Sequence, residues 1–196
     1  MEVKIKNSFM EKKLNPNNKF IVYTDGSSRG NPGPGGWSAI IINEDKSEIR
    51  NIKYEIKEIG GREKETTNNR MEMTAAIEAL KYISSVEQKN KIKKEDFQVG
   101  IFTDSEYLLK GITVWIHNWQ KNNWRTKDRK DVLNKDLWLL LSEEVEKRGV
   151  SWQRVVGHSG DKLNDRCDDI ATSFADNKKV SLFNVSKQDY KLFHKS

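Results

Sequence analysis

The stretch Phe20-Ile21-Val22-Tyr23-Thr24-Asp25-Gly26-Ser27 decides the fold of this chain. It is an apolar run that ends in a carboxylate and passes directly into a glycine-rich segment at residues 26–36. Short apolar runs bounded by turn residues are typical of buried strands. An aspartate at the end of such a strand needs a positive partner. We therefore interpret Asp25 as a metal ligand and expect the rest of the chain to supply further ligands.

Length and composition favour one globular domain with a polyanionic partner. The 196 residues are 35% hydrophobic and 33% charged, with a net charge of +6, which suits a soluble domain, although a lysine-rich composition alone does not fix a function. Cys167 is the single cysteine, which excludes an intramolecular disulfide and a four-cysteine zinc site. No stretch resembles a signal peptide or a membrane span, so we expect a cytoplasmic protein without a membrane partner.

Hydrophobic periodicity predicts three strands followed by alternating helices and strands. The first three strands, at residues 20–25, 37–42 and 52–56, are joined by short turns and favour an antiparallel meander. Two more strands are expected at 98–104 and 150–156, and helices at 70–84, 105–111, 113–121, 136–147 and 163–176. Asn68 or Asn69 is the expected N-cap of the first helix. This order predicts an α/β fold, a mixed sheet with helices on its faces.

The chain divides into one domain with two extensions. Residues 1–18 are polar and lysine-rich and are interpreted as an N-terminal extension, whereas residues 19–177 form the folded domain. Residues 178–196 are interpreted as a C-terminal tail. Its aromatic residues Phe183, Tyr190 and Phe193 are expected to pack on the domain or on a partner.

Four carboxylates stand out on the predicted elements. Asp25 and Asp104 end two apolar strands, and Glu72 and Asp168 lie on helices near small residues that permit close approach. Each alone has an ordinary explanation as a turn or surface residue. Together they could converge only if cations neutralised them, and oxygen ligands select magnesium or manganese rather than zinc. Two such ions about 4 Å apart would support an in-line phosphoryl displacement.

Several short motifs follow one another along the chain. They are Tyr23-Thr24-Asp25-Gly26-Ser27, Gly30-Asn31-Pro32-Gly33-Pro34-Gly35-Gly36, Thr67-Asn68-Asn69-Arg70-Met71-Glu72, Thr103-Asp104-Ser105, Gly157-His158 and Asn164-Asp165-Arg166-Cys167-Asp168. These motifs closely resemble those of type 1 ribonuclease H of the bacterial kind. They occur in the family's order and cover roughly residues 19–177. The resemblance implies a ribonuclease H-like fold with a five-stranded mixed sheet. Its first three strands form the antiparallel meander, its last two are parallel to the first, and helices flank both faces.

The resemblance also implies an activity and a set of catalytic residues. The implied reaction is endonucleolytic hydrolysis of the RNA strand of an RNA–DNA hybrid, with 5′-phosphate and 3′-hydroxyl products, in the removal of primers and R-loops. Asp25, Glu72, Asp104 and Asp168 would be the catalytic ligands of two Mg²⁺ ions, with Mn²⁺ as an alternative. His158 would handle protons or assist product release. We expect the enzyme to be a monomer.

Three groups of residues are implied in substrate binding. Asn31, Asn68 and Asn69 match the positions that read the minor groove and the ribose hydroxyls. Thr67 and Asn134 match a pocket for a phosphate of the DNA strand. The segment 115–135 looks like the family's basic protrusion, with Trp115, Trp119, Lys121, Trp124, Arg125 and Lys127 as candidate contacts. For Trp115 and Trp138, burial in the core is an equally good interpretation.

The sequence departs from the family pattern next to Asp104 and in the loop after His158. Glu106 stands where many bacterial members have glutamine. A carboxylate cannot donate to a base edge and would repel phosphates, so the minor-groove contact of this position is in doubt. The loop after His158 carries Asp161-Lys162-Leu163, which could alter its mobility.

Three other functions are compatible with parts of this pattern. An integrase-like DNA strand transferase would share the fold but would lack the Asn68-to-Glu72 pattern and would act equally on duplex DNA. A non-catalytic hybrid-binding module would bind hybrid without turnover, although all four carboxylates are present. A reverse-transcriptase domain is the third alternative, and the basic protrusion favours a free-standing enzyme instead.

Overall fold

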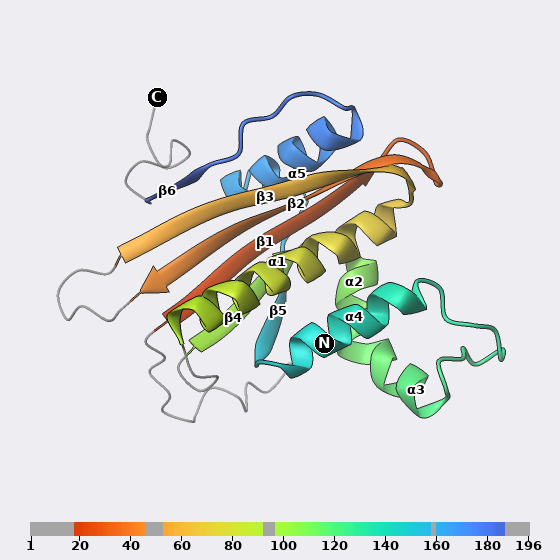
Figure 1. The fold of residues 1–196 in the computed structure, drawn as a ribbon. Coiled ribbons are helices and arrows are strands. Elements are labelled where there is room, and N and C mark those ends of the chain that lie inside the picture. Colours follow the sequence, from red (N-terminus) through yellow and green to blue (C-terminus); the bar gives the residue numbers. More distant parts are fainter. Residues whose placement is uncertain (1–17, 46–52, 92–96, 158–159, 187–196) are drawn as a thin grey trace, which may run out of the picture.

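A computed structural model describes residues 18–45, 53–91, 97–157 and 160–186. Figure 1 shows one sheet with helices on both of its faces. The strands are β1 (Asn18–Ser28), β2 (Gly33–Asp45), β3 (Lys53–Thr66), β4 (Phe97–Thr103), β5 (Val150–Arg154) and β6 (Asn184–Ser186). The helices are α1 (Asn68–Asn90), α2 (Glu106–Lys110), the π-helical turn η2 (Gly111–Trp115), α3 (Ile116–Lys121), α4 (Lys135–Glu146) and α5 (Lys162–Ala175).

The sheet has the strand order β5-β4-β1-β2-β3-β6. β1, β2 and β3 form the predicted antiparallel meander, and β4 and β5 run parallel to β1 as predicted. The prediction of five strands was wrong, because β6 adds a sixth at the β3 edge. β6 is only three residues long, which is too short for an alternating pattern to reveal it in the sequence.

The register of the two central strands carries the two strand-end aspartates to one edge of the sheet. Tyr23 lies opposite Phe102 in the parallel pairing of β1 with β4, and their rings stack with centroids 5.0 Å apart. Asp25 and Asp104 each follow two residues later. This edge lies at the carboxyl ends of parallel strands, where α/β folds bind their ligands.

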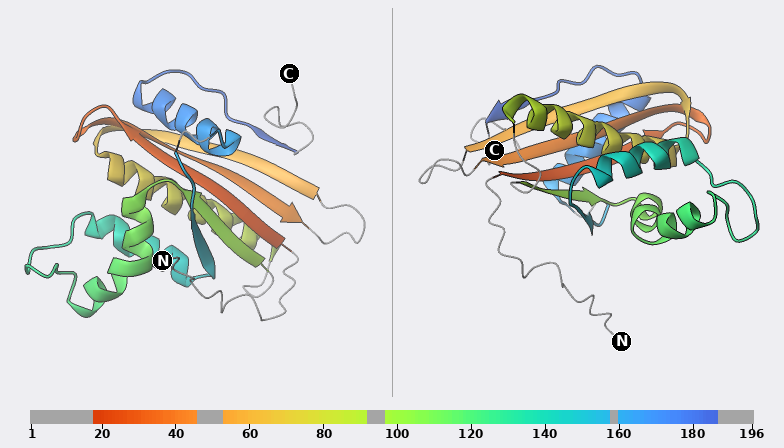
Figure 2. Two further views of the ribbon diagram at one scale, coloured as in Figure 1. Left: turned by 180° about the vertical axis from the view of Figure 1, so that it is seen from behind. Right: turned by 60° about the horizontal axis from the view of Figure 1, so that its bottom comes forward.

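Alternation along β1 divides the core between the two faces of the sheet. Phe20 and Val22 pack with the apolar side of α1. Ile21 and Tyr23 pack on the other face, in the cluster that contains Cys167 of α5. Seen from behind and from below, α1 and α4 cover one face and α5 lies across the other (Figure 2). Successive side chains of β1 point to opposite faces of the sheet, and both faces are buried. The alternation therefore determines which β1 residues pack against α1 and which pack against α5.

Two glycines allow these helices to approach the sheet closely. A Cβ at Gly26 would lie 2.2 Å from the backbone nitrogen of Glu72, and one at Gly36 would lie 2.2 Å from the carbonyl oxygen of Ala171. Real side chains cannot occupy such space, so these positions require glycine. The close contact at Gly26 places the end of β1 directly against the first turns of α1.

Helix α1 is longer at both ends than its apolar pattern predicts. It begins at Asn68 and its N-cap is Thr67, not Asn68 or Asn69, because the Thr67 hydroxyl accepts a hydrogen bond from the Arg70 backbone N–H at 3.4 Å. It continues to Asn90 and ends where Lys91 adopts a left-handed conformation. These polar final turns have no apolar stripe to mark them. β5 ends at Arg154, two residues before the predicted boundary.

A buried ion pair attaches the described part of the C-terminal segment to the domain. Glu58 of β3 is 1% exposed, and its two carboxylate oxygens accept hydrogen bonds from Arg166 of α5, each at 2.9 Å. Arg166 also donates to the carbonyl oxygen of Ser181 and stacks over the ring of Phe183. Phe183 therefore packs on the domain, whereas Tyr190 and Phe193 lie outside the described residues.

Candidate active site

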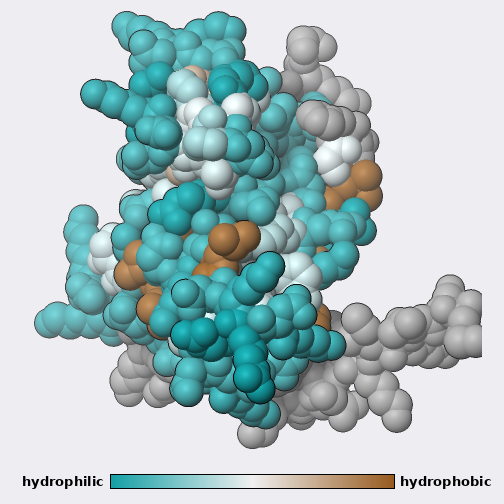
Figure 3. All heavy atoms as spheres, turned by 90° about the vertical axis from the view of Figure 1, so that its right-hand side faces the viewer, coloured by the Kyte–Doolittle hydropathy of each residue, from teal (hydrophilic) through white to brown (hydrophobic). Residues whose placement is uncertain are grey.

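One pocket of about 430 Å³ collects the four predicted carboxylates. It lies at the sheet edge where β1 and β4 end, between the first turns of α1 and α5. Its lining residues are Asp25, Gly26, Ser27, Asn68, Asn69, Glu72, Asp104, Ser105, Glu106, Tyr107, Asn164 and Asp168. The four predicted carboxylates come from β1, α1, the end of β4 and α5, and Glu106 of α2 is a fifth carboxylate in the lining. Figure 3 views the molecule from the side of the β1–β2 turn and the α3–α4 loop, and this side is mostly hydrophilic.

Asp25 is the most buried of the four carboxylates, with 8% of its surface exposed. Its Oδ1 accepts a hydrogen bond from the Gly26 backbone N–H at 2.7 Å. Burial, together with the nearby charges of Asp104, Asp168 and Glu72, raises the pKa of Asp25 to about 8, although the hydrogen bond from Gly26 opposes this. A carboxylate so placed gains a proton easily unless a cation neutralises its neighbours.

Glu72 is held in place from both sides. Its Oε1 accepts a hydrogen bond from the Asn68 amide at 2.8 Å, and its Oε2 accepts one from the Ser105 hydroxyl. Burial raises the pKa of Glu72 to about 7 with a contribution from Asp104, although the bonds from Ser105 and Asn68 oppose this. Ser105 also caps α2, accepting from the Leu108 backbone N–H at 3.1 Å. The start of α2 therefore orients a side chain of α1.

Asp104 and Asp168 complete the pocket from opposite sides, and both are partly exposed. Asp104 follows β4. Gly157, at the start of the segment after β5, lies so close that a Cβ there would be 2.7 Å from Asp104 Oδ2. His158 itself lies outside the described residues, so its predicted role stays a prediction. Its chain neighbour Gly157 lies beside Asp104.

The donor set of the pocket fits a hard divalent cation. All four charged ligands are carboxylates, and no lysine, arginine or histidine is among the described residues that line the pocket. Nowhere in the described ranges do three His, Cys, Asp or Glu side chains come close enough to hold an ion by themselves. Mg²⁺ commonly keeps several waters and uses only one or two carboxylates together with substrate phosphates. An ion here would therefore share its ligands with water and substrate.

The predicted minor-groove residues lie at the rim of this pocket. Asn68 and Asn69 line it from the first turn of α1. Asn31 is exposed in the β1–β2 turn, and its Oδ1 accepts a hydrogen bond from the Asn68 backbone N–H at 3.3 Å. The turn and the helix start are thus joined, and three amide side chains surround the mouth of the pocket.

Thr67 and Asn134 meet through Arg70 rather than directly. Besides its bond to Thr67, Arg70 donates to Asn134 Oδ1 at 3.3 Å, and it makes two hydrogen bonds with Asp136, at 3.0 and 2.7 Å. The Asn134 amide in turn donates to the Tyr107 hydroxyl at 3.1 Å. Since Tyr107 also lines the pocket, one polar network connects the predicted phosphate pocket to the carboxylates.

The predicted basic protrusion consists of α3 and the loop that follows it (Figure 2). Lys121, Arg125 and Lys127 are exposed, whereas Trp115, Trp119 and Trp124 are partly buried. The ring of Trp119 lies 5.7 Å from Trp115 and 5.5 Å from Trp138. Trp138 is completely buried, as the core interpretation expected. The tryptophans therefore anchor the segment to the core, and its basic side chains face outward.

Glu106 is paired with two cations at the pocket rim. It lies 2.7 Å from Lys110 and 3.0 Å from Arg154. The hydrogen bond and charge of Lys110, with the charge of Arg154, lower the pKa of Glu106. The charge of Glu106, which departs from the family pattern, is thus balanced by two basic side chains of the same chain. Glu106 should therefore repel substrate phosphates less than an unpaired carboxylate would.

The residues that line the pocket but were not predicted as site residues are Gly26, Ser27, Ser105, Tyr107 and Asn164. Ser105 and Tyr107 flank Glu106 in the first turn of α2, and Asn164 precedes Asp168 by one helical turn. The spacing of four residues places Asn164 and Asp168 on the same face of α5, which is a signal the sequence did contain. No sequence signal identifies Tyr107, because its role depends on its contact with Asn134 in another element.

This fold and this pocket define a class of protein, the carboxylate-dependent nucleases that use divalent cations. The family model described as RNase H matches residues 17–176. Proteins called ribonuclease H from Solibacter usitatus and Rickettsia bellii are 46% identical over 157 residues and 47% identical over 153 residues. These matches cover 80% and 78% of this chain and 94% and 86% of the relatives. The chain belongs to the ribonuclease H family.

Solved structures agree with this assignment. LC9-RNase H1, described as a type 1 RNase H with the type 2 active-site motif, has a TM-score of 0.72 at 28% identity over 90% of this chain and 82% of its own. LC11-RNase H1, solved in complex with RNA/DNA hybrid, shares the fold with a TM-score of 0.56 at 24% identity, over 81% of this chain and 97% of its own. Enzymes of this family hydrolyse the RNA strand of RNA–DNA hybrids and depend on divalent metal ions.

Proposed function

We propose that this enzyme cleaves its hybrid substrate endonucleolytically with two Mg²⁺ ions held by Asp25, Glu72, Asp104 and Asp168, leaving 5′-phosphate and 3′-hydroxyl ends. The observation that carries the proposal is the convergence of four carboxylates from four elements on one pocket without a basic side chain among its described lining residues. The ions would activate the attacking water and stabilise the departing 3′-oxygen. Mn²⁺ is the alternative ion, because it accepts the same oxygen ligands.

Residues around the carboxylates keep them in position for this reaction. Ser105 and Asn68 fix both oxygens of Glu72, and the Gly26 backbone fixes one oxygen of Asp25. Ligands held in this way need little reorganisation when the ions and substrate arrive. His158 is proposed to accept or deliver a proton during cleavage or product release, since the neighbouring Gly157 lies against Asp104.

The two strands of the hybrid are proposed to contact different parts of the surface. Asn31, Asn68 and Asn69 would contact the RNA strand and its 2′-hydroxyl groups at the pocket rim. Thr67 and Asn134, connected by Arg70, would hold a phosphate of the DNA strand. Lys121, Arg125 and Lys127 would contact further DNA phosphates, with Trp115, Trp119 and Trp124 supporting that segment and offering their remaining exposed surface. Such contacts predict an affinity that falls steeply with salt.

The cellular role follows from the substrate class. A hybrid-specific endonuclease of this kind would remove primers and R-loops during DNA replication. We propose that it acts in the cytoplasm as a monomer, with residues 19–177 as the catalytic domain. None of the helices in the described ranges has the length and apolar character of a membrane span.

A strand-labelled cleavage assay tests the proposal. The substrates are an RNA–DNA hybrid, duplex RNA and duplex DNA of one sequence, each incubated across separate Mg²⁺ and Mn²⁺ titrations. We expect cleavage of only the RNA strand of the hybrid, and a cooperative dependence on the ion. Equal cleavage of duplex DNA would favour a strand-transferase function, and tight hybrid binding without cleavage under any metal condition would favour a binding module.

A further inference from the structure

Asn164 lines the pocket, and its side-chain amide oxygen has no hydrogen-bond donor among the described residues. It lies in the first turn of α5 and is 2% exposed. Its backbone N–H donates to Asp161 Oδ1 at 3.3 Å. Its side-chain Oδ1 is buried, and no described residue donates a hydrogen bond to it. Asn164 nevertheless borders the carboxylate pocket, one helical turn before Asp168.

An unsatisfied amide oxygen in this position is costly for the fold. Burying a hydrogen-bonding group without a partner opposes folding, and more than nine-tenths of buried polar groups have one. An apolar side chain of similar size would avoid this cost. The position is therefore better explained by a ligand in the pocket that donates a hydrogen bond than by stability alone.

The chemistry of the pocket limits which ligand this can be. The charged side chains that line the pocket are carboxylates, which accept hydrogen bonds but do not donate them when ionised. A hydrated divalent cation does donate, through the water molecules that fill its remaining ligand positions. Asn164 and Asp168 share one face of α5, so an ion held by Asp168 would have its hydration shell beside the Asn164 amide.

We propose that Asn164 is a positioning residue that accepts a hydrogen bond from the hydration shell of the cation held by Asp168. This inference rests on the proposed function, because it assumes that Asp168 is a metal ligand. Asn164 would orient the hydrated ion without being a ligand itself. Partners of this outer kind commonly affect metal affinity by 10- to 100-fold.

Equilibrium binding of Mn²⁺ tests this role without relying on activity. The full-length, metal-free protein is titrated with Mn²⁺, and the free ion is measured by its electron paramagnetic resonance signal. Asn164→Leu should bind Mn²⁺ at least about 10-fold more weakly than the wild type. It should also unfold at the same or a higher urea concentration in EDTA, because the unsatisfied amide is gone. Asn164→Asp keeps an acceptor oxygen and should bind Mn²⁺ at least as tightly as the wild type.

Asn43 provides a matched control. Its Oδ1 in β2 is also buried without a partner among the described residues, and it does not line the pocket. Asn43→Leu should therefore leave Mn²⁺ affinity unchanged. Wild-type affinity in Asn164→Leu, or weakened binding in Asn164→Asp, would overturn the role of Asn164. If the wild type does not bind Mn²⁺, or if Asp168→Asn binds as well as the wild type, the proposed function itself fails.

Discussion

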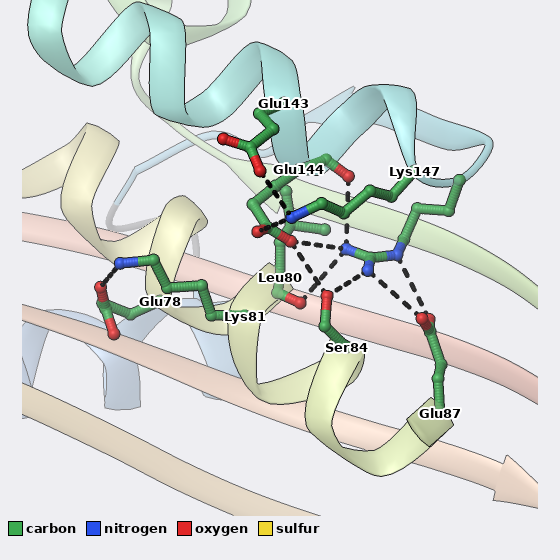
Figure 4. A network of polar contacts seen from close by, with 9 residues as sticks. Glu78, Leu80, Lys81, Ser84, Glu87, Glu143, Glu144 and Lys147 are labelled. Carbon is green, nitrogen blue, oxygen red and sulfur yellow. Dashed lines mark hydrogen bonds and ion pairs between the residues drawn. The ribbon is translucent and has the colours of Figure 1, made fainter. Parts of the chain in front are cut away.

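The buried carboxylates at the two ends of α1 have opposite surroundings. Near its C-terminal end, Glu87 faces Arg148, whose guanidinium also bonds Glu144 of α4 at 3.3 Å. Ser84 and Lys147 complete this network, which we call the α1–α4 clamp (Figure 4). Near the N-terminal end, Glu72 faces Asp25, Asp104 and Asp168. The clamp contains its own cations, whereas the pocket has to obtain them from solution.

This difference shows in the protonation of the two sites. In the clamp, burial raises the pKa of Glu87 despite the charge and hydrogen bond of Arg148. At Glu144, burial is outweighed by hydrogen bonds from Lys147 and Ser84 and by the charges of Lys147 and Arg148, which lower the pKa. In the pocket, burial and like charges act together, and the pKa values of Asp25 and Glu72 rise to about 8 and about 7. We conclude that the clamp stabilises the fold, whereas the metal-free pocket destabilises it.

The largest expected effect comes from removing a charge from the pocket. Asp25→Asn should lower kcat by on the order of 10³-fold or more, because a metal ion contributes several kcal/mol to the transition state. In EDTA at pH 8 or above, where Asp25 is ionised, the same variant should be more stable than the wild type, since a buried like charge is gone. Cleavage of labelled hybrid and urea unfolding measure the two effects. A variant that remains active, or that is destabilised in EDTA, contradicts the assignment of Asp25.

Removing a charge from the clamp should lower the stability of the protein and leave its activity unchanged. Arg148→Met leaves Glu144 and Glu87 buried without their guanidinium, which should cost about 3–5 kcal/mol in the free energy of unfolding. The activity per folded molecule should not change, because the clamp is distant from the pocket. Urea unfolding and hybrid cleavage at low temperature measure both.

Lys81→Met is the matched control for the clamp. Lys81 pairs with Glu78 on the same helix at 2.7 Å (Figure 4). Both side chains are partly exposed, by 46% and 35%. Exposed pairs contribute at most about 1 kcal/mol. Equal destabilisation by the two variants would show that the clamp is not a buried network.

A smaller effect is expected where the sheet meets the start of α1. Gly26→Ala places a Cβ 2.2 Å from the Glu72 backbone nitrogen, so Asp25 and Glu72 must move apart. Such overpacking costs about 1–3 kcal/mol, and a shift of about 1 Å in a catalytic group can reduce kcat/KM by about 10²-fold. Gly149→Ala is the control, because a Cβ there meets nothing within 4 Å. Comparable losses in both variants would exclude a specific contact at Gly26.

Much of the fold and of the site could be predicted because local patterns carry the information. The apolar run that ends in Asp25 predicts both a buried strand and a ligand at its end, and the parallel pairing with β4 was implied by the family resemblance. Thr67 was missed as the N-cap because Asn68 and Asn69 are equally good capping residue types. β6, the clamp and the Asn134–Tyr107 bond depend on contacts between distant elements, which no local pattern encodes.

A further expected effect is the pH dependence of metal-free stability. The pKa of Asp25 is about 8 in the folded protein and about 4 in an unfolded chain. Between these values the folded state binds more protons than the unfolded state, so stability falls as pH rises. The stability that Asp25 contributes through this proton is fully present below about pH 4. It is lost as the pH rises to the pKa of Asp25 in the folded protein, about 8. Urea unfolding in EDTA across this range should show the decline, and Asp25→Asn should flatten it.

The pKa of Asp25 itself tests the account most directly. It can be measured from the carboxyl ¹³C chemical shift in an aspartate-labelled protein, with Asp25→Asn used to assign the signal. In metal-free protein we expect the Asp25 carboxyl group to titrate with a midpoint near pH 8. Saturating Mg²⁺ should shift this midpoint down toward the ordinary value near 4. An ordinary pKa for Asp25 in the absence of metal, or a high pKa that Mg²⁺ does not lower, would contradict the claim that this pocket depends on cations from solution.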